Sequence, residues 1–151
     1  MTVLLSNLAK TALLAAFPIA FNGGHIRVFG GARPASPNGA QAGSLLGTIT
    51  RNGLPAALGA PAALTFVQQG PYILHDPDEL WTLTVIASGS ATWFRLVADV
   101  DDPGDADASR LRIDGTASDF AGAGELRMPN TALVANTVLS PLSFIYTIPP
   151  L

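Results

Sequence analysis

The chain has 151 residues, of which 48% are hydrophobic and 13% are charged, and its formal net charge is −3. This length suits one domain, and the apolar fraction is too high for a disordered chain. The lack of cysteine excludes disulfides, thiolate metal sites and a cysteine nucleophile. A mean hydropathy of +0.37 with so few charges is unusual for a free monomer and favours a subunit of a larger assembly.

Charge is divided unevenly along the chain. The first 75 residues carry four basic side chains and no acid, a formal charge of +4, whereas residues 76–151 carry all 11 acids against four arginines, a formal charge of −7. One interpretation is a basic partner surface through Arg27, Arg33 and Arg51. The other is that folding interleaves the halves and blurs the asymmetry. With one lysine and no basic cluster, nucleic-acid binding is not expected.

The first predicted element is a helix over residues 3–16, which Pro18 should end. Its core-facing stripe follows the helical repeat and consists of Leu5, Leu8, Ala9, Ala12, Leu13 and Ala16. Leu4 and Leu14 form a second apolar patch. We therefore expect residues 1–21 to be an arm that packs outside its own domain, at a subunit contact. The segment is not typical of a signal peptide, and no apolar run reaches the roughly 18 residues of a membrane-spanning helix.

After the arm the hydrophobic period changes from 3.6 to 2, which indicates strands. The strand-like runs are residues 25–29, 44–50, 63–67, 80–86, 91–97, 110–113, 125–128 and 137–148. In the fifth run, Phe94 and Leu96 should face the core. Trp93 and Arg95 should face the other way. We expect the second sheet to cover one face of this strand and either the helix or a partner to cover the other. We predict an all-β class: a jelly roll or β-sandwich of about eight strands in one domain, residues 22–151, after the helical arm.

Residues 87–90 are predicted to form a tight hairpin turn between the fourth and fifth runs. The acidic stretches 76–79 and 99–107 are predicted to be solvated turns. A calcium loop at 99–107 is the alternative, since Asp99, Asp101 and Gly104 match three positions of the EF-hand pattern. Pro103 and Arg110 stand where that pattern needs ligands.

The sequence contains no recognisable catalytic constellation. His25 and His75 fit no metal-binding spacing, Ser88 and Ser90 lack the nucleophile-elbow pattern, and the glycines at 122–124 precede a strand rather than a helix. We predict no enzyme activity, no cofactor and no metal.

Several ordered motifs resemble a known family. They are the helix ending in Phe17, FNGGHIRVF at 21–29, GARP at 31–34, GSLLGTI at 43–49, ATWFRL at 91–96 and ELRMPNTALVANTV at 125–138. Together they resemble the small jelly-roll cement, or decoration, proteins of tailed bacteriophages, which cover joints between capsid subunits. The chain departs from that pattern at residues 68–80, where 68–79 looks inserted, and in the acidic loop 99–109.

The resemblance implies a virion structural protein that is made in the host bacterial cytoplasm and located on the capsid exterior. Its expected partners are the major capsid protein and further copies of itself, as a dimer or trimer. A tail or baseplate component facing the host or a glycan is the main alternative, and a stand-alone enzyme or small-ligand binder is a third. The residues expected at partner contacts are Leu4, Leu14, Arg27, Arg33, Arg51 and Trp93.

Overall fold

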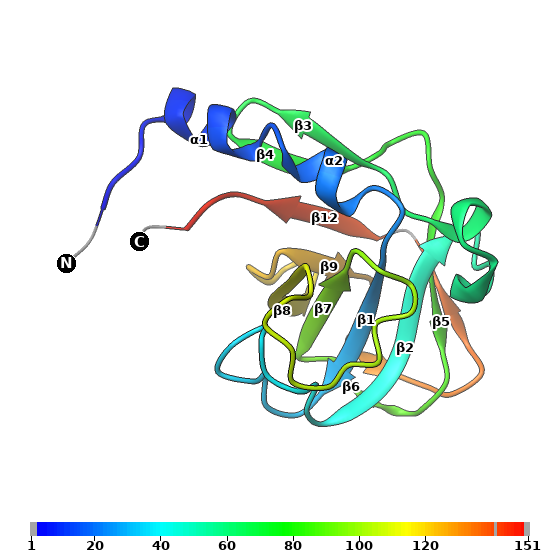
Figure 1. The fold of residues 1–151 in the computed structure, drawn as a ribbon. Helices are drawn as coiled ribbons and strands as arrows, with labels where there is room; N and C mark the ends of the chain where they lie inside the picture. Colours follow the sequence, from blue (N-terminus) through cyan, green and yellow to red (C-terminus); the bar gives the residue numbers. More distant parts are fainter. Residues whose placement is uncertain (1–2, 141, 150–151) are drawn as a thin grey trace.

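Two short helices and twelve strands make up a mostly β chain in the computed structural model, which describes residues 3–140 and 142–149 (Figure 1). The helices are α1 (Asn7–Leu14) and α2 (Phe17–Phe21), and two 3₁₀ turns, η1 (Ala56–Leu58) and η2 (Ala60–Ala62), lie in the apolar loop after β2. The strands are β1 (His25–Gly30), β2 (Ser44–Arg51), β3 (Phe66–Gln69), β4 (Tyr72–His75), β5 (Trp81–Val85), β6 (Gly89–Ser90), β7 (Trp93–Val97), β8 (Arg112–Asp119), β9 (Leu126–Met128), β10 (Ala132–Leu133), β11 (Val138–Leu139) and β12 (Ser143–Tyr146).

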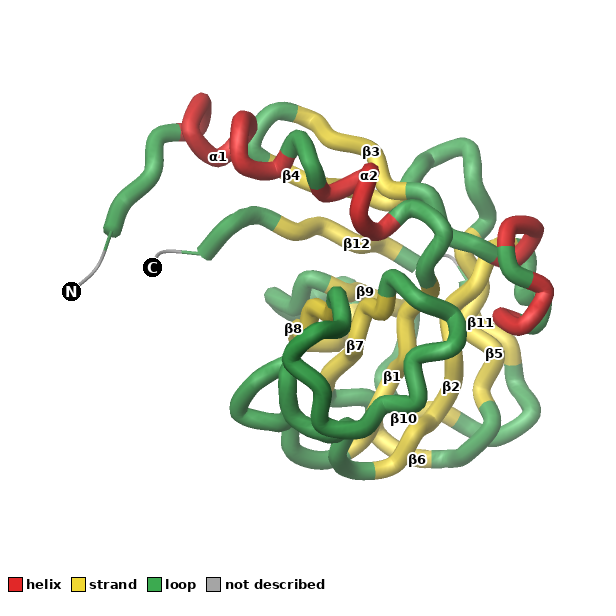
Figure 2. The backbone as a smooth tube through the Cα atoms, in the orientation of Figure 1, coloured by secondary structure: helices red, strands yellow, loops and turns green. Residues whose placement is uncertain are grey.

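Ten of these strands form one curled sheet in the order β11-β5-β2-β1-β7-β8-β9-β12-β4-β3, and β10 pairs with β6 in a small separate ribbon. All pairs are antiparallel except β8 with β9. The helices, β3, β4 and β12 lie together above the remaining strands (Figures 1 and 2). The predicted class, all-β and jelly-roll-like with an N-terminal helical arm, is confirmed.

The concave side of the sheet holds the main core. Phe94 and Leu96 are fully buried there, as their alternation predicts, and Phe94 meets Phe144 edge to face with ring centroids 5.8 Å apart. Trp81 and Phe66 join the same aromatic cluster at 5.2 Å. The curl thus brings β3, at one end of the sheet, against β5 near the other.

The predicted arm differs from the structure in three ways. α1 begins at Asn7 because the Ser6 hydroxyl caps it by accepting a hydrogen bond from the Ala9 N–H. Pro18 does not end the helical segment; it lies in the first turn of α2, where its missing N–H costs nothing. The predicted core stripe is wrong, because Leu8 and Leu13 are 80% and 60% exposed while Leu14 is only 3% exposed.

The strand pairing also corrects two expectations. Residues 87–90 do not join a hairpin: β5 pairs with β2 and β11, whereas β7 pairs with β1 and β8. Both faces of β7 are buried, which requires a central position in the sheet. The segment 68–79, which looked inserted, supplies β4 and so completes the β3–β4 hairpin that extends the sheet beyond β12.

The remaining differences concern element lengths. β8 continues to Asp119, well past the predicted run 110–113, although its second half lacks apolar alternation. The predicted last run splits into β11 and β12, and Pro141 between them lies outside the described residues.

Candidate interaction surface and cavity

The N-terminal arm presents one apolar face to the core and another to solvent. On the inner face, Phe17 packs on Phe21 and on Tyr146 of β12, with ring centroids 4.7 and 5.5 Å apart. Together with Leu14, these aromatic rings fix the arm to the β3–β4–β12 layer. The expectation that the whole segment 1–21 lies outside its own domain is therefore wrong for residues 14–21.

The outward face of the arm is the most apolar exposed feature near the N-terminus. We call it the arm surface and define it as Leu4, Leu8, Leu13 and Ile19, with exposed fractions from 60% to 86%. Lys10 is the sole charged side chain of residues 1–21. Four large apolar side chains exposed on an arm that is anchored to the core favour a protein contact.

Two of the residues predicted to touch a partner are buried inside the chain. Leu14 belongs to the core, and Trp93 is 2% exposed. Trp93 stacks on Phe29 of β1, with centroids 4.3 Å apart and planes 10° from parallel. The face of the sheet that bears Trp93 and Arg95 is covered by the chain itself, since the Arg95 guanidinium donates to the Gly39 carbonyl of the loop after β1. Neither residue offers a partner surface.

The three arginines of the basic half do not gather on one surface. Arg51 binds Glu79 at 3.0 Å and donates to the carbonyls of Ala60 and Pro61, which holds the η2 turn in place. Arg27 is half-buried and donates to the Asp102 carbonyl at 2.6 Å. Only Arg33 is exposed. Of the two interpretations of the charge asymmetry, interleaving of the halves is therefore the correct one.

Two buried ion pairs hold the loops over the convex side of the sheet. Arg95 binds Asp114 through two hydrogen bonds of 2.7 and 2.8 Å, and Arg112 binds Asp102 at 2.6 and 2.5 Å. Burial pushes the pKa of Asp102 up, but hydrogen bonds from Arg112 and the Gly104 N–H outweigh this and leave its pKa below the ordinary value. The acidic loop 99–107 is thus not simply a solvated turn, because Asp102 anchors it in the protein.

His25 on β1 belongs to the same buried group. Burial, followed by the charge of Arg27, lowers its pKa from 6.5 to about 4. The Arg27 Nε–H donates to His25 Nε2 at 3.3 Å, which requires that this nitrogen carry no proton. His25 is therefore a neutral structural residue at neutral pH. In the part of the chain that the structure describes, no three His, Asp or Glu side chains meet in a way that could hold a metal ion.

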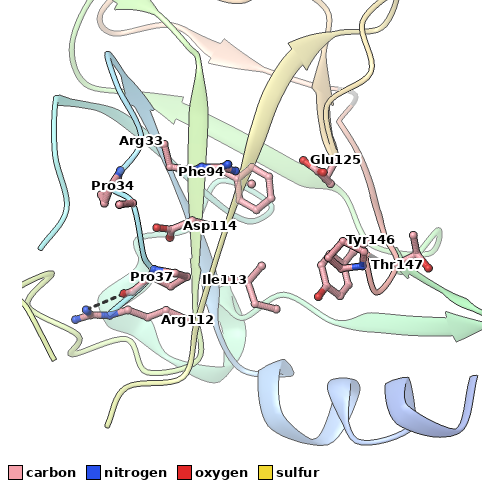
Figure 3. Close-up of a pocket in the computed structure, with 13 residues that line it drawn as sticks. Arg33, Pro34, Pro37, Phe94, Arg112, Ile113, Asp114, Glu125, Tyr146 and Thr147 are labelled. Carbon is pink, nitrogen blue, oxygen red and sulfur yellow. Dashed lines mark hydrogen bonds between the residues drawn. The ribbon is translucent and has the colours of Figure 1, made fainter. Parts of the chain in front are cut away.

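A cavity of about 470 Å³ lies between the loop after β1, strand β8 and the segment around the end of β12 (Figure 3). Its lining includes Arg33, Pro34 and Pro37 on one side, Glu125, Tyr146 and Thr147 on the other, and Phe94 and Ile113 between them (Figure 3). Gly115 of β8 also belongs to the lining. This volume lies within the range of small-ligand sites. Of these lining residues, sequence analysis had singled out Arg33 as a partner contact and Phe94 as a core residue.

No protein-family model, curated protein or solved structure is matched by this chain. None of the helices within residues 3–140 and 142–149 is long and apolar enough to span a membrane.

Proposed function

We propose that the chain is a non-enzymatic virion structural protein, a decoration subunit that binds the outer surface of a bacteriophage capsid and stabilises contacts between major capsid proteins. The observation that carries this proposal is the arm surface: exposed leucines and an isoleucine on α1, on α2 and in the segment before α1, in an arm that Leu14, Phe17 and Phe21 fix to the core. The resemblance of the motifs at 21–49, 91–96 and 125–138 to cement proteins supports the choice of a capsid as the partner.

The physical argument favours apolar attachment over electrostatic attachment. Exposed ion pairs contribute about 0–1 kcal/mol each and are screened beyond roughly 10 Å at 0.1 M salt. Apolar burial contributes about 25 cal/mol per Å², so even a modest contact through the arm surface exceeds several such pairs before the costs of association. The chain also holds most of its arginines in internal contacts, which leaves Arg33 and Lys10 as the most accessible cations of the first half.

The experiment that tests this proposal is a copy-number measurement on purified virions. Quantitative mass spectrometry should find this chain in numbers comparable to those of the major capsid protein, and electron cryo-microscopy should place it on the outside of the shell. A few copies per particle, located at the tail, would instead support a tail or baseplate component. Absence from purified particles would refute a virion role altogether.

A further inference from the structure

The cavity beside β8 contains a carboxylate, that of Glu125, which forms no ion pair with any described residue. Glu125 Oε2 accepts a hydrogen bond from the Thr116 N–H at 2.8 Å, and the Glu125 carbonyl accepts one from the Ile145 N–H at 2.9 Å. These two bonds fix Glu125 between β8 and β12. Among the described residues, no Lys, Arg or His nitrogen lies within 4.0 Å of its carboxylate, and none donates a hydrogen bond to Oε1.

The other charges of the cavity are already paired or exposed to solvent. Asp114 is bound by Arg95, and Arg112 by Asp102, so each forms a neutral pair with its partner. Arg33 is exposed on the opposite side and forms no ion pair within the described chain. Among the described lining residues, Glu125 is therefore the only acid whose charge is available to a ligand.

Aromatic and apolar groups surround this carboxylate. Phe94 and Tyr146 line the cavity from β7 and β12, and Figure 3 shows Ile113 between Tyr146 and the loop side. Burial, and then the charge of Glu125, raises the pKa of Tyr146. Gly115 lets the Phe94 ring and the Glu125 carboxylate approach β8 closely, because a Cβ there would lie 2.5 Å from the Phe94 ring and 3.1 Å from Glu125 Oε2.

We propose that this cavity binds the basic side chain, arginine or lysine, of a partner protein, with Glu125 as the counter-ion and Tyr146 as the aromatic wall. A cation on an apolar stem matches both features, since the head pairs with the carboxylate and the stem lies along the tyrosine ring. The lining includes exposed residues of the loop after β1, Arg33 and Ala35, and the exposed Pro149 after β12, so the cavity opens to solvent and a side chain of another protein can enter it. This inference does not rest on the proposed capsid role.

The test is a titration of the full-length, ¹⁵N-labelled protein with capped single amino acids, and binding is measured from the chemical shifts of the backbone amides. N-acetyl-arginine amide should shift the amide signals of Gly115, Thr116 and Thr147 and saturate with a dissociation constant on the order of 1 mM. N-acetyl-citrulline amide, which has nearly the same shape without the charge, should bind at least tenfold more weakly. Agmatine is the probe for a free small cation.

Two variants make the result specific. Glu125→Gln keeps an acceptor for the Thr116 N–H and should weaken binding of the arginine probe about tenfold or more, whereas Arg33→Ala removes a like charge and should tighten it on the order of twofold. Both variants should keep the melting temperature within a few degrees of the parent.

Three outcomes would overturn the proposal: no saturable shifts with the arginine probe, equal binding of arginine and citrulline probes, or an unchanged dissociation constant in Glu125→Gln. Tight binding of agmatine together with no binding of the capped residue would show a site for a free cation and would contradict the protein-partner assignment. None of these outcomes bears on the proposed virion role, which the copy-number measurement tests separately.

Discussion

Arg95 and Asp114 face each other directly across β7 and β8, and both side chains are almost completely buried. The guanidinium forms two hydrogen bonds to the carboxylate, and its remaining nitrogen donates to the Gly39 carbonyl at 3.0 Å. One arginine therefore ties two central strands to the loop after β1. This loop also forms one side of the cavity that contains Glu125.

The first prediction concerns this pair. Asp114→Asn should lower the free energy of unfolding by about 3–5 kcal/mol, because it leaves the Arg95 charge buried without a counter-ion. The double variant Arg95→Met/Asp114→Leu should lose less than Asp114→Asn, since it removes both charges. Urea unfolding of the parent protein, Asp114→Asn and the double variant measures their free energies of unfolding. A loss below about 1 kcal/mol for Asp114→Asn would mean that water reaches the pair.

Alanine substitutions at two neighbouring leucines distinguish the buried face of the arm from its exposed face. Leu14→Ala should cost about 2–5 kcal/mol of unfolding free energy because it leaves a cavity in the core. Leu13→Ala changes the same residue type one position earlier, on the exposed face, and should stay within about 0.5 kcal/mol. Equal effects in chemical denaturation would show that the arm is not fixed as the structure has it.

Trp93 and Phe94 should both act on stability, although they lie on opposite sides of β7. Phe94→Ala and Trp93→Ala should each cost about 3–5 kcal/mol, the first in the main core and the second beneath the loop after β1. Leu111→Ala, at an exposed position, is the control and should be nearly neutral. Thermal unfolding checks all three; a neutral Trp93→Ala would contradict the stacking on Phe29.

The lowered pKa of His25 predicts that the stability of the folded protein depends on pH. Because its pKa is about 4 in the folded protein and 6.5 in the unfolded chain, the unfolded chain takes up the proton first as the pH falls. Its contribution to stability is constant above pH 6.5 and declines between pH 6.5 and 4, by about 3 kcal/mol in total.

The matched variant for this effect is His25→Gln, which cannot titrate. Denaturant unfolding at a series of pH values should give a flatter curve for His25→Gln between pH 6.5 and 4. Carboxylates such as Asp102, which titrate at lower pH, are common to both proteins and cancel in the comparison. Parallel curves for the two proteins would show that His25 is accessible to protons in the folded state.

Period-2 alternation was sufficient to predict the all-β class and the core positions of Phe94 and Leu96. It could not predict which strands pair, because β5 and β7 are both mostly apolar and their pairing depends on partners far away in the sequence. It also could not identify the inner face of the arm. Leu8 and Leu14 are both leucines on one short helix, and the choice between them depends on where Phe17 anchors the segment.

The charged groups were the least predictable part. Arg95 within an apolar strand and Asp114 in a later one give a local hint of a buried pair, but the pairing depends on the register of β7 and β8. Glu125 and Tyr146 are 21 positions apart and line the same cavity only because β12 returns beside β9. No local motif links those two residues, so the cavity could not be found from the sequence.

The central claim, attachment to a capsid through the arm surface, is tested most directly by rebinding purified protein to particles stripped of it. The parent and Leu111→Asp should occupy the shell to the same level and remain bound in molar salt, whereas Leu8→Asp should remain folded and lose most of its occupancy, because the substitution places a charge in an apolar contact. Full occupancy by Leu8→Asp, or release of the parent protein by salt alone with the shell intact, would contradict the account.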